Sequence, residues 1–402
     1  MVRLGAVFLM PIPDDENGPS PPSLSRLFVS FLAFGCLGFG GPALIALFRR
    51  TVVEKKRWLD EQSFQNGVAL SQIVPGAMAM QVAAYVGLRV AGVAGAAVCL
   101  LGCGLPAFAL MMILSALYTQ MHALPSVVAV FGGLQAVVVA IVAHATVTFG
   151  RAILRRRSDF ALAALAAGML GLGLHPILAI LLAALLGLIV VGNRPAPTQS
   201  ALPRPNNTNH RKTLSLLLLA TAAGFATLFF WNRRLAELAA TMFRIDLFAF
   251  GGGFGAAPLF FHEVVQVHSW MAATTFLDGL ALGQLTPGPV MITATFVGYW
   301  LAGPLGGIVA TVAIFLPSFL LLIGLVPYFD ALNESPHFRK ATAGILCCFV
   351  GLLLTVTIHF AANVSWGSVH ILLAAAAFVA LMFRVNILWV VLSGTLVSLV
   401  LQ

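Results

Sequence analysis

One apolar segment occurs twice in this chain, around residues 58–87 and 270–298, and a Pro-Gly step interrupts both copies. Over the first nineteen positions, at a fixed offset of 212, eight residues are identical. Past the prolines the offset falls to 211, where Leu105-Pro106 matches Leu316-Pro317. Single residues gained or lost between otherwise matching segments are what two diverged copies show. The chain is therefore an internal duplication.

The break in each copy combines a polar amide with a helix-breaking step. The two sets are Gln72 with Pro75-Gly76, and Gln284 with Pro287-Gly288. Proline inside a helix removes a backbone hydrogen bond and clashes with the preceding turn. In hydrocarbon, broken backbone occurs only against protein or a watery cavity. A single proline more often only shapes packing, but interrupted segments at matching positions of two halves indicate a transporter's binding site.

The composition places the protein in the lipid bilayer. Of the 402 residues, 60% are hydrophobic and 9% charged, against about 25% charged in soluble domains. A net charge of +9 might suggest nucleic acid as a partner, but Lys and Arg stand in short clusters between long apolar runs. We therefore predict an all-α polytopic membrane protein that does not bind nucleic acid. The two homologous halves would contain broken or re-entrant helices, with about 10–13 transmembrane segments.

Shifts in composition divide the chain into five parts. We expect a flexible tail at 1–23, a first repeat at 24–192, a polar linker at 193–212, an extra transmembrane helix at 213–235 and a second repeat at 236–402. One extra span between the copies would invert the second repeat relative to the first. The prediction is therefore an inverted repeat.

The distribution of basic residues supports this inversion. If segments 25–48, 64–88, 236–261 and 276–298 are re-entrant and the N-terminus is cytoplasmic, 19 Lys and Arg lie inside and three outside. If every apolar run spans the membrane, 14 lie inside and eight outside. Both versions obey the positive-inside rule, and the re-entrant one obeys it better. Both also place the two broken segments in opposite orientations.

Several motifs carry a family resemblance. They are FGGP at 39–42, VVEKKRW at 52–58, LSQIVPG at 70–76, AFGGGFGAAPL at 249–259, LGQLTPGP at 282–289, TFVGY at 295–299 and FLPSF at 315–319. With these motifs in this order, the chain resembles the two-domain, long-chain form of the chromate transporter (CHR) family. One departure is Ala77, where that family usually has a second proline, so the two half-sites are expected to differ.

The resemblance implies a secondary transporter that exports chromate across the bacterial inner membrane and confers chromate resistance. It implies a gradient-driven mechanism rather than ATP hydrolysis, with sulfate as a competing analogue. A proton is the expected coupling ion, and a homodimer is one option for assembly. The sequence contains no Walker-type phosphate loop, and we predict no cofactor, metal ion or catalytic residue.

The chemistry of chromate, a tetrahedral dianion, requires hydrogen-bond donors and positive potential. A helix that begins after a Pro-Gly break directs free N–H groups and about half a positive charge toward the break. Amides and hydroxyls near the breaks add donors. The glycine motifs would form a second anion-binding nest or simply pack helices closely. The predicted binding residues are Gly40, Gly41, Ser71, Gln72, Pro75, Gly76, Arg89, Gly251, Gly252, Gln284, Thr286, Pro287 and Gly288.

Ionisable groups in the apolar runs are further candidates, because such groups in membranes are usually functional. Arg89 follows the first broken segment and is either an anion contact or an interfacial anchor. Asp278 stands beside the second break, where the first copy has Asn66, and either carries a coupling proton or caps its helix. Arg244 and Asp246 lead into the second glycine motif.

Two other functions remain to be weighed against chromate export. The same fold could carry sulfate or another anion, since helix ends and amides recognise charge and shape rather than the metal. A membrane-embedded enzyme acting on lipid would need clustered acids, bases or metal ligands, and such residues are sparse in the apolar runs. Binding at the breaks also predicts that Gln284→Ala weakens transport far more than Gln135→Ala.

Overall fold

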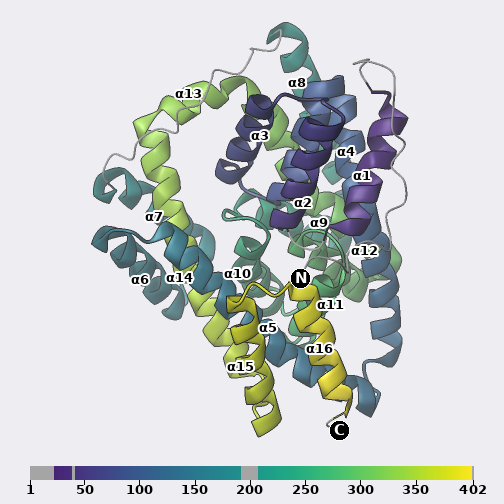
Figure 1. Cartoon of the computed structure of the whole chain (residues 1–402), viewed down its shortest axis with the longest axis vertical. Coiled ribbons are helices and arrows are strands. Elements are labelled where there is room, and N and C mark those ends of the chain that lie inside the picture. Colours follow the sequence, from purple (N-terminus) through teal and green to yellow (C-terminus); the bar gives the residue numbers. More distant parts are fainter. Residues whose placement is uncertain (1–21, 39–40, 192–206, 401–402) are drawn as a thin grey trace.

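The computed structural model describes residues 22–38, 41–191 and 207–400, and these are helical with no β-strand (Figure 1). The predicted tail at 1–23, most of the predicted linker and Gly40 lie outside the described residues. The expectation of an all-α protein with two homologous halves is confirmed.

The first half contains seven helices and one π-helical stretch. In order they are α1 (Leu24–Leu37), α2 (Gly41–Phe48), η1 (Arg49–Lys55), α3 (Glu61–Ile73), α4 (Met78–Met121), α5 (Pro125–Ile153), α6 (Arg157–Gly171) and α7 (Pro176–Val190). A further helix, α8 (Asn207–Trp231), leads to the second half. The extra helix predicted at 213–235 is α8, which begins six residues before the predicted start and ends four residues before the predicted end. It ends because the Asn232 side chain accepts hydrogen bonds from the next turn and starts α9.

The second half repeats this order. It contains α9 (Arg233–Leu247), η2 (Gly253–Ala256), α10 (Ala257–Phe260), η3 (Phe261–Val267), α11 (Ala273–Leu285), η4 (Val290–Ile292), α12 (Thr293–Leu325), η5 (Val326–Tyr328), α13 (Phe329–Glu334), α14 (Pro336–Asn363), α15 (Ser368–Met382) and α16 (Ile387–Val400). Even unusual backbone angles recur: Gly76 has φ 120° and Gly288 has φ 124°. The duplication seen in the sequence is a duplication of structure.

The long helix α4 turns back on itself. Gly92 has φ 66° and ψ −158°, and Gly303 in α12 repeats this conformation with φ 64° and ψ −155°. A Cβ atom added at Gly87 would lie 2.2 Å from the carbonyl oxygen of Gly95, eight residues further along the chain. Residues this far apart are about 12 Å apart in a straight helix. Residues 78–90 and 93–121 therefore form a tight hairpin, closed by glycine packing.

A second hairpin closes around each Pro-Gly break. A Cβ added at Gly67 in α3 would touch the ring of Tyr85 in α4, and Gly279 lies against Phe296 in the same way. The two arms thus run back along each other, with the break at the tip. Each arm has about 13 residues, or roughly 20 Å, which is shorter than the roughly 30 Å hydrocarbon core. This geometry favours the re-entrant interpretation of segments 64–88 and 276–298.

Each half has a further hairpin before the one that surrounds its Pro-Gly break. Phe31 and Phe34 of α1 stack against Phe48 at the end of α2, with ring centroids 5.3 and 5.4 Å apart. In the second half, Arg244 of α9 pairs with Glu263 of η3. Each half therefore contributes two hairpins whose tips are a glycine motif and a Pro-Gly break.

The remaining helices interlock the halves. Helices α6 and α7 of the first half pack on α14 of the second, while α15 and α16 pack on α5. Where α5 meets α14, the Thr146 and Thr357 hydroxyls are 3.2 Å apart, and these two residues are equivalent at the offset of 211. Contact between equivalent residues marks a two-fold axis, here an approximate one between the halves. In Figure 1, α1, α2 and α3 lie at one end of the molecule, and α11, α15 and α16 at the other.

Five described segments are long and apolar enough to cross a membrane, at residues 78–121, 125–153, 212–231, 290–328 and 336–363. Two of them contain the hairpin turns at Gly92 and Gly303. The helices α6, α7, α15 and α16 have only 14 or 15 residues each. The chain is a multi-pass membrane protein built from long spans, short paired helices and helical hairpins.

The glycine hairpin generates a prediction about folding. We expect Gly87→Leu to abolish the monodisperse peak in size-exclusion chromatography, because backbone of Gly95 occupies the space of the new side chain. Its effect should exceed the about 1–3 kcal/mol of ordinary overpacking. The control is Gly168→Leu, an exposed helical position with nothing within 4 Å of an added Cβ, which should elute as the wild type does. Equal behaviour of the two variants would contradict the hairpin.

Candidate functional site

The Pro-Gly breaks of each half contact the glycine motif of the other half. The N–H of Gly76 donates to the carbonyl of Ala249 at 2.8 Å, and the N–H of Gly288 donates to the carbonyl of Gly38 at 2.9 Å. These pairs are equivalent under the internal repeat. Hairpin tips that enter from opposite ends of the molecule therefore meet near its middle.

The second glycine motif brings the two breaks close together. Ala249, at the start of the motif, accepts a hydrogen bond from the first break. Gly253 lies against the second break, because a Cβ atom added to Gly253 would be 3.4 Å from the backbone nitrogen of Val290. Between them, Gly251 and Gly252 both have φ 82°, and nothing lies within 4 Å of an added Cβ at either position. Here glycine is needed for the left-handed backbone rather than for packing. The open space beside these residues is consistent with an anion-binding nest.

Helix starts face both breaks. Helix α4 begins at Met78 after Gly76, and the helical run of η4 and α12 begins at Val290 after Gly288. The first N–H groups of a helix have no partner within the helix, and they carry partial positive charge. Pro75 and Pro287 are buried, so these helix ends lie inside the protein rather than at a lipid-facing surface.

The two glutamines that the duplication makes equivalent lie in different environments. Gln284, at the end of α11, is 8% exposed and forms no hydrogen bond with the described residues. Gln72 is exposed on α3. The second break therefore has a buried amide that is available to a ligand, and the first does not. The sequence alone treats the two as one symmetric pair.

The predicted hydroxyl donors are already engaged. Ser71 donates to the carbonyl of Gly67 at 2.9 Å, and Thr286 donates to the carbonyl of Gly283 at 2.9 Å. Both side chains are buried. In this conformation they offer lone pairs rather than protons, so they would have to rotate before they could donate to an anion.

Arg89 is far from the breaks. It is half-buried near the outer end of the first arm of α4, thirteen residues beyond Gly76 and next to the turn at Gly92. At about 1.5 Å per residue this arm separates it from the break by roughly 20 Å. This separation favours the interfacial anchor over the anion contact, and the role of Arg89 stays a prediction.

Asp278 connects three helices. Its two oxygens accept hydrogen bonds from the Tyr118 hydroxyl at 2.6 Å and the Gln135 amide at 2.8 Å, from α4 and α5 of the other half. Both carboxylate oxygens thus accept hydrogen bonds, which favours a structural role in which Asp278 holds α11 against α4 and α5. A coupling role for Asp278 stays a prediction. From the sequence alone, Gln135→Ala is the control for Gln284→Ala. It is unsuitable as a control because Gln135 hydrogen-bonds to Asp278.

The first break has a buried carboxyl group of its own. Asp246, at the end of α9, is fully buried, and one of its oxygens accepts from the Ser318 N–H at 2.8 Å and the Ser318 hydroxyl at 2.6 Å. Its other oxygen has no partner among the described residues and lies 2.9 Å from the position of a Cβ added at Gly76. At the second break the equivalent positions are Gly35 and Ala107, neither of which carries a carboxyl group.

A second polar cluster lies toward the open end of the α9–η3 hairpin. The buried carboxylate of Glu263 pairs with Arg244, and its oxygens lie 3.5 Å from His175 and 3.8 Å from His268. In the first half the equivalent of Glu263 is Thr51. The cluster therefore combines His175 of the first half with residues of the second, and sequence reasoning did not single it out because the histidines are far apart in the chain.

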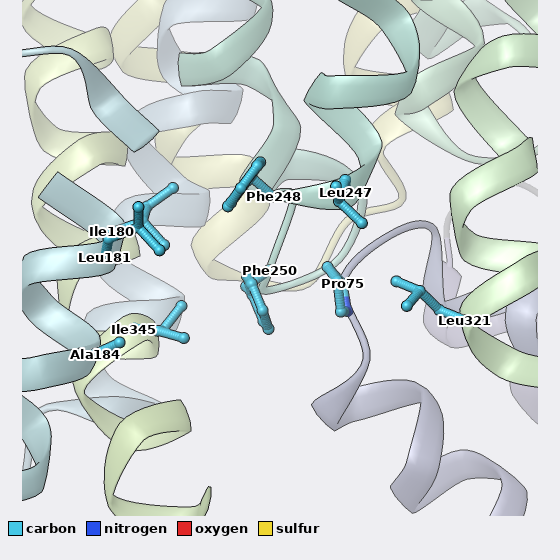
Figure 2. A pocket seen from close by; sticks show the side chains of 9 residues that line it. All are labelled: Pro75, Ile180, Leu181, Ala184, Leu247, Phe248, Phe250, Leu321 and Ile345. Atoms are coloured by element: carbon cyan, nitrogen blue, oxygen red, sulfur yellow. The ribbon is translucent and has the colours of Figure 1, made fainter. Parts of the chain in front are cut away.

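An apolar cavity of about 330 Å³ opens beside the first break (Figure 2). Figure 2 shows Pro75 between Phe250 and Leu321, with α7 across the cavity. The lining residues are Pro75, Ile180, Leu181, Ala184, Leu247, Phe248, Phe250, Leu321 and Ile345. It provides no hydrogen-bonding side chain for an anion, so it forms an apolar wall next to the polar centre rather than the binding site.

Comparisons with known proteins agree with this architecture. A family model described as "Chromate transporter" matches residues 25–188 and again 236–399. An uncharacterized transporter of Methanocaldococcus jannaschii is 39% identical, with 92% of each chain covered. A chromate transport protein of Pseudomonas aeruginosa is 33% identical over 86% of this chain and 83% of its own. One from Cupriavidus metallidurans is 28% identical over 86% and 88%.

No solved structure is similar enough to match. The two family matches coincide with the two structural halves and leave out α8, which the duplication also leaves unpaired. The chain belongs to the chromate transporter family, with one family domain in each half.

Proposed function

We propose that this protein is a secondary transporter that exports chromate across the bacterial inner membrane and so confers chromate resistance. The observation that carries the proposal is the meeting of two Pro-Gly breaks, from oppositely entering hairpins, around a shared glycine loop. Broken helices that meet inside an inverted repeat are where secondary transporters bind their substrates. The choice of chromate as the substrate is based on the relatives that are named as chromate transport proteins.

The anion is expected at the second break. Gln284 offers a free amide there, the η4–α12 helix start offers partial positive charge, and Gly35 stands where the first break has the Asp246 carboxyl group. Gly251 and Gly252 provide backbone that can approach the anion closely. Thr286, Pro287 and Gly288 shape the break itself, and the first break, with Ser71, Pro75 and Gly76, completes the opposite wall of the site. Gly41, at the start of α2, belongs to the neighbouring tip.

The same chemistry admits sulfate. It is also a tetrahedral dianion, and amides with helix dipoles recognise charge and shape without contacting the metal atom. Transport of sulfate on the same fold is therefore the alternative cargo, and the two anions should compete.

The proposed orientation has a cytoplasmic N-terminus, because the re-entrant arrangement places 19 of the 22 Lys and Arg on that side. The proposed energy source is an ion gradient, with the proton as the coupling ion. Monomer and homodimer are both compatible with this mechanism, since each chain contains a full pair of breaks.

Transport in everted membrane vesicles tests the proposal. Vesicles that contain the protein should accumulate labelled chromate, because export from the cell becomes uptake into an everted vesicle. Excess sulfate should reduce uptake, and an uncoupler should abolish it. Vesicles lacking the protein are the control. Transport of sulfate without any transport of chromate would show that sulfate, and not chromate, is the substrate. Uptake of chromate by right-side-out vesicles alone would show that the protein imports the anion instead of exporting it.

The duplication provides a matched pair of variants for the site. Gln284→Ala should lower chromate transport about ten- to a hundredfold, because it removes a buried donor to a charged ligand, typically about 1.5–3 kcal/mol. Gln72→Ala changes the same residue at the equivalent but exposed position and should retain most of the activity. Initial rates at matched protein levels measure both. Equal losses in the two variants, or a larger loss for Gln72→Ala, would argue against binding at the second break.

A further inference from the structure

The two half-sites of this protein differ by one ionisable group. At the first break, Asp246 of α9 and Ser318 of α12 occupy the positions that Gly35 and Ala107 occupy at the second. Asp246 is fully buried at the start of α4, where a helix end attracts negative charge. Its carboxyl group therefore lies where the repeat would otherwise leave room for an anion.

Two buried oxygens near this point lack a donor. One carboxyl oxygen of Asp246 and the amide oxygen of Gln81 have no hydrogen-bond partner among the described residues, and both side chains are at most 1% exposed. The Gln81 amide nitrogen donates to the carbonyl of Pro75 at 2.6 Å, which fixes this side chain at the same break. A Cβ added at Gly76 would lie 2.9 Å from that Asp246 oxygen and 3.0 Å from the Gln81 nitrogen. A buried acceptor without a donor is unfavourable. A proton on the free oxygen of Asp246 would turn this acceptor into a hydrogen-bond donor.

A metal ion fits this place poorly. Hard cations such as Mg²⁺ and Ca²⁺ take six or more oxygen ligands. Here only two side-chain oxygens lack donors, since the other Asp246 oxygen already accepts two hydrogen bonds from Ser318. Among the described residues, no group of three or more His, Cys, Asp and Glu could hold a metal ion.

Other charged groups do not neutralise Asp246. Arg244 on the same helix pairs with Glu263. Helices α8 and α12 pack against α9, and their titratable side chains in the described part of the chain are Lys212 and Tyr299. Neither forms an ion pair or hydrogen bond with Asp246, and neither does Arg89 of α4.

We propose that Asp246 is a proton-binding site that controls anion occupancy of the central site: the dianion binds with one proton on the Asp246 carboxyl group. A bound dianion and an ionised Asp246 would both lie at the breaks, inside a low-dielectric protein where like charges repel strongly. Protonation of one carboxyl oxygen removes this repulsion and leaves the Ser318 hydrogen bonds to the other oxygen in place. The inference rests on the proposed function, and it assigns the proton that is linked to anion binding to Asp246 rather than to Asp278, whose oxygens are both occupied.

Titration calorimetry of the purified full-length protein tests the inference. Sulfate is the main probe, because it stays a dianion from about pH 5.5 to about pH 8.5, whereas chromate takes up a proton in this range. Wild-type Kd for sulfate should rise with pH, up to about tenfold per unit, the limit for one linked proton. Repeating the titration in buffers of different ionisation enthalpy should show proton uptake that approaches one per bound anion at the upper end of this range, where Asp246 is ionised in the free protein.

Two variants of buried carboxyl groups separate a specific role from a general one. Asp246→Asn, which is permanently neutral, should bind sulfate with a Kd that changes less than about twofold over the same pH range and with no proton uptake. Asp278→Asn removes the other buried carboxyl group near a break and should keep the pH dependence of the wild type, whatever its stability.

The outcomes distinguish this inference from the proposed function. Binding of sulfate or chromate with the same pH dependence in wild type and Asp246→Asn overturns the inference alone. Loss of pH dependence in Asp278→Asn instead assigns the proton to Asp278 and also overturns it. Failure of both anions to bind at any pH overturns the proposed function and the inference together. If Asp246→Asn does not fold, wild-type proton uptake decides, because binding without uptake at every pH of the range contradicts the inference.

Discussion

Backbone that leaves a helix inside a membrane must find hydrogen-bond partners within the protein, and this requirement organises the whole molecule. At each Pro-Gly break the glycine N–H is satisfied by a carbonyl from the other half, Gly76 by Ala249 and Gly288 by Gly38. Neither half can complete its own break. The crossed hydrogen bonds therefore explain why the two repeats occur in one chain with a single helix, α8, between them, since an odd span lets the second repeat enter from the opposite side.

A duplicated scaffold does not produce a symmetric site. The backbone at the two breaks is nearly identical, with φ of 120° at Gly76 and 124° at Gly288. The side chains around it have diverged: Asp246 and Ser318 at one break replace Gly35 and Ala107 at the other. A symmetric pair of helix ends would attract two anions or hold one anion from both sides. A carboxyl group at one of them makes that end dependent on protonation and leaves the other end free for the anion.

The sequence predicted the parts of this fold that repeat and missed those that depend on contacts between residues far apart in the chain. The duplication, the breaks and the inversion follow from matched residues and from the distribution of basic residues. Sequence alone leaves Arg89 as an anion contact or an interfacial anchor, because apolar length does not reveal the reversal of α4 at Gly92. Gln72 and Gln284 are identical in sequence, yet only the latter is buried, since burial depends on packing partners outside the repeat. Asp246 was noted beside the glycine motif, but its contact with Ser318, 72 residues away, needs the tertiary structure.

The same crossed hydrogen bonds bear on how the transporter moves. Alternating access requires one element to rock against another around a fixed site. Relative motion of the hairpin tips would stretch the bonds of Gly76 and Gly288, whose net contribution is about 0.5–1.5 kcal/mol each. Two such bonds are weak enough to break and reform during a transport cycle. The interlocked packing of α6 and α7 on α14, and of α15 and α16 on α5, is far more extensive and joins both halves into one frame. Motion is therefore expected of the hairpins within this frame rather than of one complete half against the other.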